Sequence, residues 1–101
     1  MITRIVKLHI QPDKLEDFKK IYLSSANTIR SFSGCRSVEV YQKSDTPEIV
    51  FTYSKWDTED DLNAYRNSNF FNDVWKSVKP LFLQKAEAWS LVSLQENIDR
   101  P

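Results

Sequence analysis

The stretch SVEVYQKSDTPEIVFTYSKWDTEDDL, residues 37–62, decides the fold of this chain. Two runs rich in β-branched and aromatic residues, 37–43 and 48–56, are separated by the turn-forming residues 44–47. This pattern predicts an antiparallel β-hairpin. Thr58 and Asp61, directly after the second run, have the spacing of a helix capping box. We therefore expect a hairpin followed at once by a helix.

On the N-terminal side of this stretch, residues 2–10 alternate between two faces. This periodicity of two predicts a strand that ends before Pro12. Its strongly apolar face carries Val6, Leu8 and Ile10.

A long helix is expected between this strand and the hairpin. Asp13 and Glu16 have capping-box spacing, and apolar residues then recur at helical spacing over residues 15–32. Gly34, the only glycine of the chain, follows the last of them. A glycine at this point predicts a left-handed C-cap.

The segment after the hairpin contains two helical stripes rather than one. Leu62 and Tyr65 define the first stripe, but the apolar residues of 70–78 point in another direction. Residues 67–69, Asn-Ser-Asn, favour caps over helix interiors. We predict two helices with a break near residue 68, the second ended by Pro80.

Residues 85–94 read as a last strand, and residues 95–101 as a polar tail. The order strand, helix, strand, strand, helix pair, strand predicts an α+β fold with the ferredoxin-like βαββαβ arrangement. In that arrangement the helices cover one face of an antiparallel four-stranded sheet. A length of 101 residues fits one domain, 1–101.

Several strands carry apolar side chains on both faces, although the helices can cover only one. Soluble monomers rarely expose such a surface, so we expect a homodimer that pairs two sheets face to face. The residues on the second face include Ile5, Phe51, Tyr53, Trp89 and Leu91.

Composition excludes several classes of protein. With 14 basic and 14 acidic residues the formal net charge is zero, which disfavours nucleic-acid and anionic-membrane binding. No apolar run is long enough to span a bilayer, and the N-terminus does not resemble a signal peptide. The single cysteine, Cys35, cannot form an internal disulfide and reads as a small apolar residue at the start of a strand. We expect a cytoplasmic protein.

Several of these segments together resemble the antibiotic biosynthesis monooxygenase (ABM) family over roughly residues 2–94. They are the strand that ends at a proline, the helix ended by Gly34-Cys35, the strand end Lys55-Trp56-Asp57, the segment 59–65 and Ser68-Asn69-Phe70. The resemblance implies a dimeric α+β barrel of ferredoxin-like subunits, with a pocket between the helices and the sheet of each subunit. It also implies a cofactor-independent oxygenase of quinols, anthrones and related polycyclic aromatics, whereas relatives of the same fold bind and degrade heme.

The family's functional residues transfer only in part. Trp56 matches the tryptophan at the end of the third strand. Phe70 stands where quinol-monooxygenase-like members often carry a histidine, and Trp75 or a neighbour where heme-degrading relatives place their iron ligand. Val6 aligns with the catalytic asparagine of those relatives. These departures disfavour heme degradation and remove the obvious general base.

The residues themselves suggest an apolar pocket for a flat ligand near the second helical region, although the same aromatic set also fits a plain core. The pocket candidates are Val6, Leu8, Trp56, Tyr65, Asn69, Phe70, Val74 and Trp75, and Phe71 and Phe82 belong to the same aromatic set. Trp56, Asn63 and Tyr65 are the catalytic candidates, because their polar groups could stabilise a phenolate. Tyr53, Tyr65 or bound water would then serve as the base.

No cofactor or metal site is expected. His9 is the only histidine and reads as a surface or interface residue on the face opposite Val6 and Leu8. No cluster of carboxylates has the spacing of a metal site. Two functions remain: a monooxygenase that uses dioxygen and a small aromatic or quinol-like substrate, and a non-catalytic dimeric module that binds a small molecule.

Overall fold

The computed structural model describes residues 1–94. Its elements, in chain order, are β1 (Ile2–His9), the 3₁₀ turn η1 (Pro12–Lys14), α1 (Leu15–Arg30), β2 (Cys35–Lys43), β3 (Thr46–Trp56), α2 (Glu59–Arg66), α3 (Asn69–Val78), the 3₁₀ turn η2 (Lys79–Leu81) and β4 (Glu87–Leu91). The order confirms the predicted βαββαβ arrangement. The expected tail, residues 95–101, lies outside the described residues.

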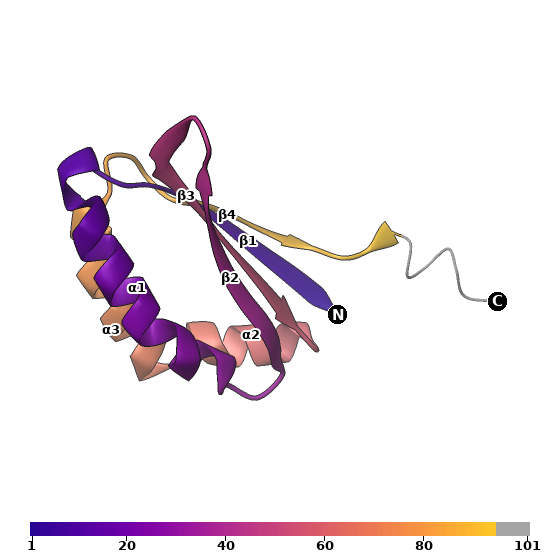
Figure 1. Ribbon diagram of the computed structural model, residues 1–101. Coiled ribbons are helices and arrows are strands. Elements are labelled where there is room, and N and C mark those ends of the chain that lie inside the picture. The colour runs from indigo at the N-terminus through magenta and orange to yellow at the C-terminus, as the bar shows by residue number, and fades with distance from the viewer. Residues whose placement is uncertain (95–101) are drawn as a thin grey trace.

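The four strands form one antiparallel sheet in the order β2-β3-β1-β4. β1 lies inside the sheet, so Ile5 faces Tyr53 on one side and Trp89 on the other. Figure 1 shows all the helices on one side of this sheet, with the other side left open. The ferredoxin-like fold is therefore confirmed.

The core fills the space between the helices and the sheet. One cluster of buried residues comprises Leu8, Ile10, Phe18, Val50 and Val78. A second, near the other end of the sheet, comprises Ile29, Val38, Trp56 and Leu62. The alternation of residues 2–10 thus directs the predicted apolar face of β1 toward the helices.

Gly34 has a φ of 81°, as expected for a left-handed position after a helix. A Cβ built on Gly34 would lie 2.6 Å from Asp61 Cβ, so α2 also packs closely against this turn. The Gly34 carbonyl accepts a hydrogen bond of 2.8 Å from the backbone N–H of Asp57. The glycine therefore allows both the turn after α1 and the close approach of α2.

The predicted break between two helices is confirmed. Thr58 Oγ1 accepts from the backbone N–H of Asp61 at 3.1 Å, which caps α2. Ser68 Oγ accepts from the backbone N–H of Phe71 at 3.1 Å, which caps α3. Each helix therefore has its own N-cap, and the apolar stripe can change direction between them.

Several ends of elements differ from the prediction. The capping box of Asp13 and Glu16 is absent, because Pro12–Lys14 form a 3₁₀ turn that leads into α1 and leave no side-chain cap there. The last strand covers Glu87–Leu91 rather than residues 85–94, and at its far end Leu91 already pairs with Thr3 near the start of β1. The hairpin turn is shorter than expected, since Lys43 pairs with Thr46.

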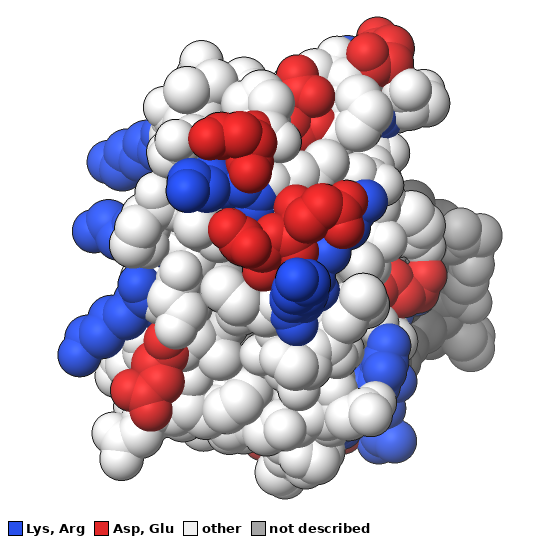
Figure 2. Space-filling view, turned by 60° about the vertical axis from the view of Figure 1, so that its left-hand side comes forward, with Lys and Arg blue, Asp and Glu red and all other residues white. Residues whose placement is uncertain are grey.

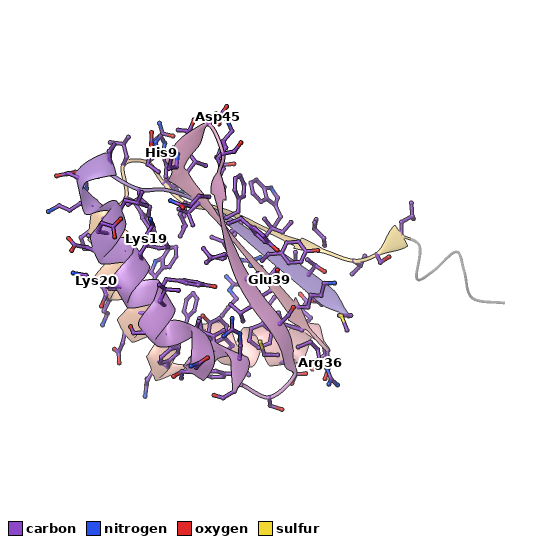
Figure 3. All side chains as sticks on the ribbon, in the orientation of Figure 1. His9, Lys19, Lys20, Arg36, Glu39 and Asp45 are labelled. Carbon is purple, nitrogen blue, oxygen red and sulfur yellow. The ribbon has the colours of Figure 1, made fainter. Side chains whose placement is uncertain are left out.

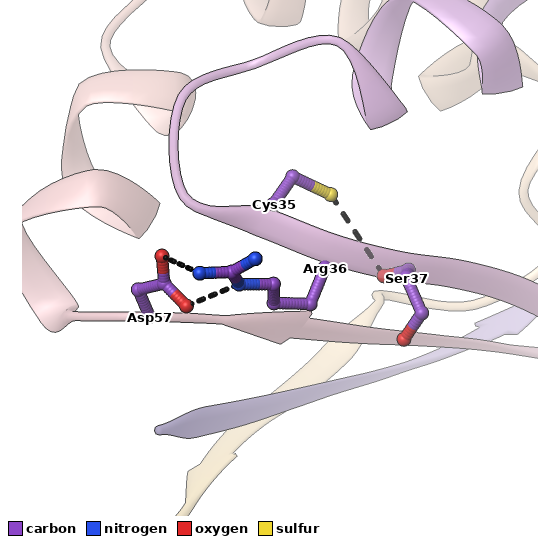
Figure 4. Close-up of polar contacts among 4 residues, drawn as sticks. All are labelled: Cys35, Arg36, Ser37 and Asp57. Carbon is purple, nitrogen blue, oxygen red and sulfur yellow. Dashed lines mark hydrogen bonds and ion pairs between the residues drawn. The ribbon is translucent and has the colours of Figure 1, made fainter.

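Surface charges are mixed rather than segregated. On the helix side, acidic and basic side chains lie interleaved (Figure 2). Figure 4 shows one ion pair at the start of β2, where the Arg36 guanidinium donates to both carboxylate oxygens of Asp57. No helix within residues 1–94 is long and apolar enough to cross a membrane.

Candidate functional site

A cavity of about 380 Å³ lies between the helices and the sheet. Its wall is mostly apolar, with contributions from all four strands and from α1, α2 and α3. The lining residues are Arg4, Val6, Leu8, Phe18, Tyr22, Ile29, Val38, Thr52, Ser54, Leu62, Tyr65, Arg66, Phe71, Val74, Trp75, Val78, Ala86 and Ala88. Its place between sheet and helices is the one that the family resemblance implies.

Five of the pocket residues expected from the sequence line this cavity: Val6, Leu8, Tyr65, Val74 and Trp75. The remaining candidates, Trp56, Asn63, Asn69 and Phe70, are not among the lining residues. Sequence spacing placed all of them near one region, but spacing does not show which side chains face an empty volume.

Trp56 is the clearest case. Its side chain is 0% exposed, and its indole Nε1–H donates to Ser54 Oγ at 3.0 Å. The indole stacks on Tyr65, with 5.1 Å between ring centroids. Trp56 therefore contacts two cavity residues, Ser54 and Tyr65, without lining the cavity itself. Its indole N–H is bonded to Ser54 rather than free for a ligand.

The other three candidates lie on the helices next to the cavity rather than on its wall. Asn69 is exposed at the start of α3, and Asn63 is partly buried on α2. Phe70 packs against Phe32, with ring centroids 5.9 Å apart, and belongs to the second core cluster.

The expected convergence of aromatic residues is confirmed as a chain of ring contacts. Tyr65 contacts Trp56, Phe32 and Phe71, each at a centroid distance of 5.1 Å. From Phe71 the chain continues through Trp75 to Phe82, with centroid distances of 6.0 and 5.4 Å. Part of this set is core and part is cavity wall.

Two tyrosines, Tyr22 and Tyr65, belong to the cavity wall. The Tyr22 hydroxyl is fully buried without a hydrogen bond among residues 1–94. Burial raises the pKa of Tyr22 to about 12, and burial likewise raises the pKa of Tyr65, with smaller contributions from Tyr22 and Cys35. Both phenols therefore stay protonated at neutral pH, so each has a proton to donate in a hydrogen bond and neither is ionised to serve as a base.

The sequence analysis missed five polar cavity residues, three from strands and two from helices. They are Arg4, Thr52, Ser54, Tyr22 and Arg66. Arg4 carries a detectable signal, since it shares its strand face with the apolar Val6 and Leu8. Tyr22 lies on the apolar stripe of α1, and nothing in the stripe itself marks a hydroxyl that will lack a partner.

Other candidate residues lie elsewhere. Tyr53 and His9 alternate with the cavity-facing residues of β3 and β1 and so lie on the open face of the sheet; Figure 3 places His9 near the hairpin end of β1. Tyr53 is therefore not positioned to act as a base in the cavity.

Cys35 begins β2 as expected, a partly buried free thiol whose pKa is raised by burial. Within residues 1–94, no three potential metal-ligating side chains cluster together.

An antiparallel sheet covered by helices on one face, with an apolar cavity between them, defines this protein as a ferredoxin-like α+β domain with an internal pocket. The family model described as antibiotic biosynthesis monooxygenase matches residues 1–77. The chain belongs to this family.

Solved structures show the same fold at low sequence identity. A protein of Nitrosomonas europaea, named for the same family, superposes with a TM-score of 0.87 at 19% identity, covering 93% of this chain and 99% of its own. A conserved protein of Methanosarcina mazei superposes with a TM-score of 0.85 at 23% identity, covering 90% of this chain and 91% of its own. A Caulobacter crescentus protein named for the same family superposes with a TM-score of 0.87 at 17% identity, covering 92% of this chain and 89% of its own. No curated protein sequence matches the chain significantly.

Proposed function

We propose that this protein is a cofactor-independent monooxygenase that oxidises a small aromatic, quinol-like or polycyclic substrate in the cavity between the helices and the sheet. The observation that carries the proposal is the apolar cavity with Tyr22 and Tyr65 in its wall; the Tyr22 hydroxyl is buried and has no hydrogen-bond partner among residues 1–94. A buried polar group without a partner is costly, and a ligand oxygen would satisfy it.

The cavity has a suitable size for such a substrate. Its volume is about 380 Å³, whereas an apolar cavity of about 150 Å³ holds one benzene. Two to three aromatic rings would therefore fill it. Trp75 and Phe71 supply flat surfaces against which rings can stack.

The reaction needs an ionised substrate. After loss of a proton, the substrate anion passes one electron to dioxygen, and the two radicals combine to a hydroperoxide. Loss of water from the hydroperoxide converts the substrate CH₂ to a carbonyl, so that CH₂ and O₂ give C=O and H₂O. Donors aimed at the developing oxyanion lower the barrier to its formation.

Tyr22 and Tyr65 line the cavity, and their protonated hydroxyls are the proposed donors. Neither a histidine nor a carboxylate belongs to the cavity wall formed by residues 1–94. Bound water is therefore the proposed proton acceptor, with the substrate made more acidic by the surrounding donors.

Oxygen consumption tests this proposal, with anthrone and a hydroquinone as substrates. Wild-type protein should consume dioxygen, and Tyr22→Phe and Tyr65→Phe should each lower kcat about tenfold or more, because a hydrogen bond to a charged group is worth about 1.5–3 kcal/mol. Tyr53→Phe, on the open face, is the matched control and should retain activity. Equal activity in all four proteins would contradict the assigned donors.

A second function is a non-catalytic module that binds an aromatic ligand in the same cavity. The absence of a histidine or carboxylate from the described wall favours it. Saturable ligand binding without oxygen consumption would establish the module and reject the monooxygenase.

We also propose that two copies form a homodimer through their open sheet faces. No described helix covers this face, which carries apolar side chains from β1, β3 and β4. Trp89 and Leu91 are 43% and 46% exposed there. Mutual burial of two such faces would remove them from water.

We also propose that the protein is cytoplasmic. Cys35 is a free thiol, which suits a reducing compartment.

A further inference from the structure

Two arginines from separate elements meet at the cavity. Arg4 comes from β1 and Arg66 from the last residue of α2. Arg66 is exposed and Arg4 is half-buried, so this part of the cavity wall reaches the protein surface. Apart from these two residues, no charged side chain lines the cavity in the described part of the chain.

Neither arginine has an acidic partner within residues 1–94. The hydrogen bond of Arg4 goes to a neutral group, Ser90 Oγ, at 3.0 Å. The ion pairs Lys19–Glu16, Arg36–Asp57 and Lys43–Asp45 involve other residues. A guanidinium stays charged inside proteins, so the wall carries two positive charges that the described chain leaves uncompensated.

The two charges also repel each other. Burial lowers the pKa of Arg4, and the positive charge of Arg66 lowers it further. Bringing like charges together beside an apolar cavity is unfavourable unless an anion binds between them.

The neighbours of Arg4 are suited to the same anion. Arg4 lies opposite Ser54 in the strand register, and Thr52 lies two residues before Ser54 on the cavity side of β3. Ser54 Oγ accepts from the Trp56 indole, which leaves the Ser54 O–H free to donate. Trp56 is thus a positioning residue for this donor.

We infer that the ligand of this cavity is an aromatic carboxylate, whose carboxyl group binds between Arg4 and Arg66 while its rings fill the apolar part. A planar carboxylate accepts two parallel N–H bonds from one guanidinium and has lone pairs left for a second donor. The inference rests on the proposed function for the pocket and adds the charge of the substrate to it.

Isosteric ligands test the charge directly. Calorimetric titration of the full chain with 2-naphthoate and with naphthalene-2-carboxamide compares a charged and a neutral ligand of the same shape. We expect 2-naphthoate to bind at least tenfold more tightly, with a preference that weakens as salt is raised.

Variants then locate the charge preference. Arg4→Gln and Arg66→Gln should each lower the affinity for 2-naphthoate about tenfold and leave that for the carboxamide within twofold. Lys20→Gln, on the outer side of α1 (Figure 3), removes one positive charge away from the cavity and should change neither affinity. Arg66→Gln lies at an exposed helix end, so it tests the inference even if Arg4→Gln fails to fold.

The possible results separate this inference from the proposed function. Binding of both ligands with equal affinity overturns the inference and leaves the aromatic pocket standing. Binding of neither ligand overturns both. Preferential binding of 2-naphthoate that depends on the arginines supports the inference, even if anthrone and hydroquinone give no oxygen consumption and the monooxygenase proposal fails.

Discussion

Trp56 illustrates how one residue can match a family motif and yet act through its neighbours. The indole is fully buried and its N–H is bonded to Ser54. We expect Trp56→Phe to lower the free energy of unfolding by about 1–3 kcal/mol, because it removes a buried ring and a hydrogen bond. Urea denaturation measures this loss.

Ligand binding by Trp56→Phe, measured on the same protein, distinguishes support from direct contact. A packing role predicts lower stability with affinity reduced only as far as Ser54 and Tyr65 shift. Unchanged stability together with a threefold or larger loss of affinity would instead make Trp56 a direct ligand contact.

Tyr22 is a second residue whose substitution has a defined effect on stability. Its buried hydroxyl has no partner in residues 1–94, so Tyr22→Phe should raise the unfolding free energy of the ligand-free protein by about 1 kcal/mol at neutral pH. Thermal denaturation measures this gain. A destabilised Tyr22→Phe variant would contradict it.

The same residue makes stability depend on pH. The pKa of Tyr22 is about 12 in the folded protein and 10 in its unperturbed state, so between these values the unfolded chain releases a proton that the folded chain retains. The unfolding free energy should therefore fall as pH rises through this range. Denaturation at a series of pH values should show a shallower fall in Tyr22→Phe than in wild type; equal slopes would contradict the assignment.

At the scale of elements, the junction between α2 and α3 depends on one side chain. Ser68 Oγ donates to the Tyr65 carbonyl at 2.6 Å and accepts from the Phe71 N–H at 3.1 Å. It thus joins the end of one cavity-lining helix to the start of the next. Ser68→Ala should cost about 1 kcal/mol of unfolding free energy, as loss of an N-cap does.

Ser77→Ala provides the control for this element. Ser77 is exposed within α3, and its hydroxyl donates to the Asp73 carbonyl at 3.0 Å. Because alanine is a better helix former, this variant should be neutral or slightly stabilised. Equal losses in both variants, measured by urea denaturation, would show that the cap has no special role.

At the scale of the whole molecule, one face of the sheet remains uncovered by described elements. If two copies pair through it, Trp89→Glu should weaken the dimer by placing a charge in the interface. Sedimentation velocity at micromolar concentration should show a wild-type dimer and a shift toward monomer in the variant. Leu23→Glu, at a residue that is 67% exposed on α1, is the matched control and should remain dimeric. A monomeric wild type would contradict the proposed pairing.

Local patterns were sufficient to predict the elements and their order. Alternation in residues 2–10, the single glycine after the long helix and the Asn-Ser-Asn break each depend on neighbours close in sequence. The family resemblance came from the same local segments. The predicted cap at Asp13 is absent because Pro12–Lys14 form a 3₁₀ turn that continues into the helix. Both local structures fit this sequence, and the sequence alone does not determine which one forms.

The cavity wall was decided by the tertiary structure. Arg4 and Arg66 are far apart in sequence and share one cavity wall only because the fold brings α2 to the sheet face that carries Arg4. Trp56 and Ser54 are two residues apart on one strand, yet only the packing of α2 shows that the indole is core while the hydroxyl reaches the cavity. Periodicity determines which face of an element is apolar, but the volume left empty on that face depends on how the helices and the sheet fit together.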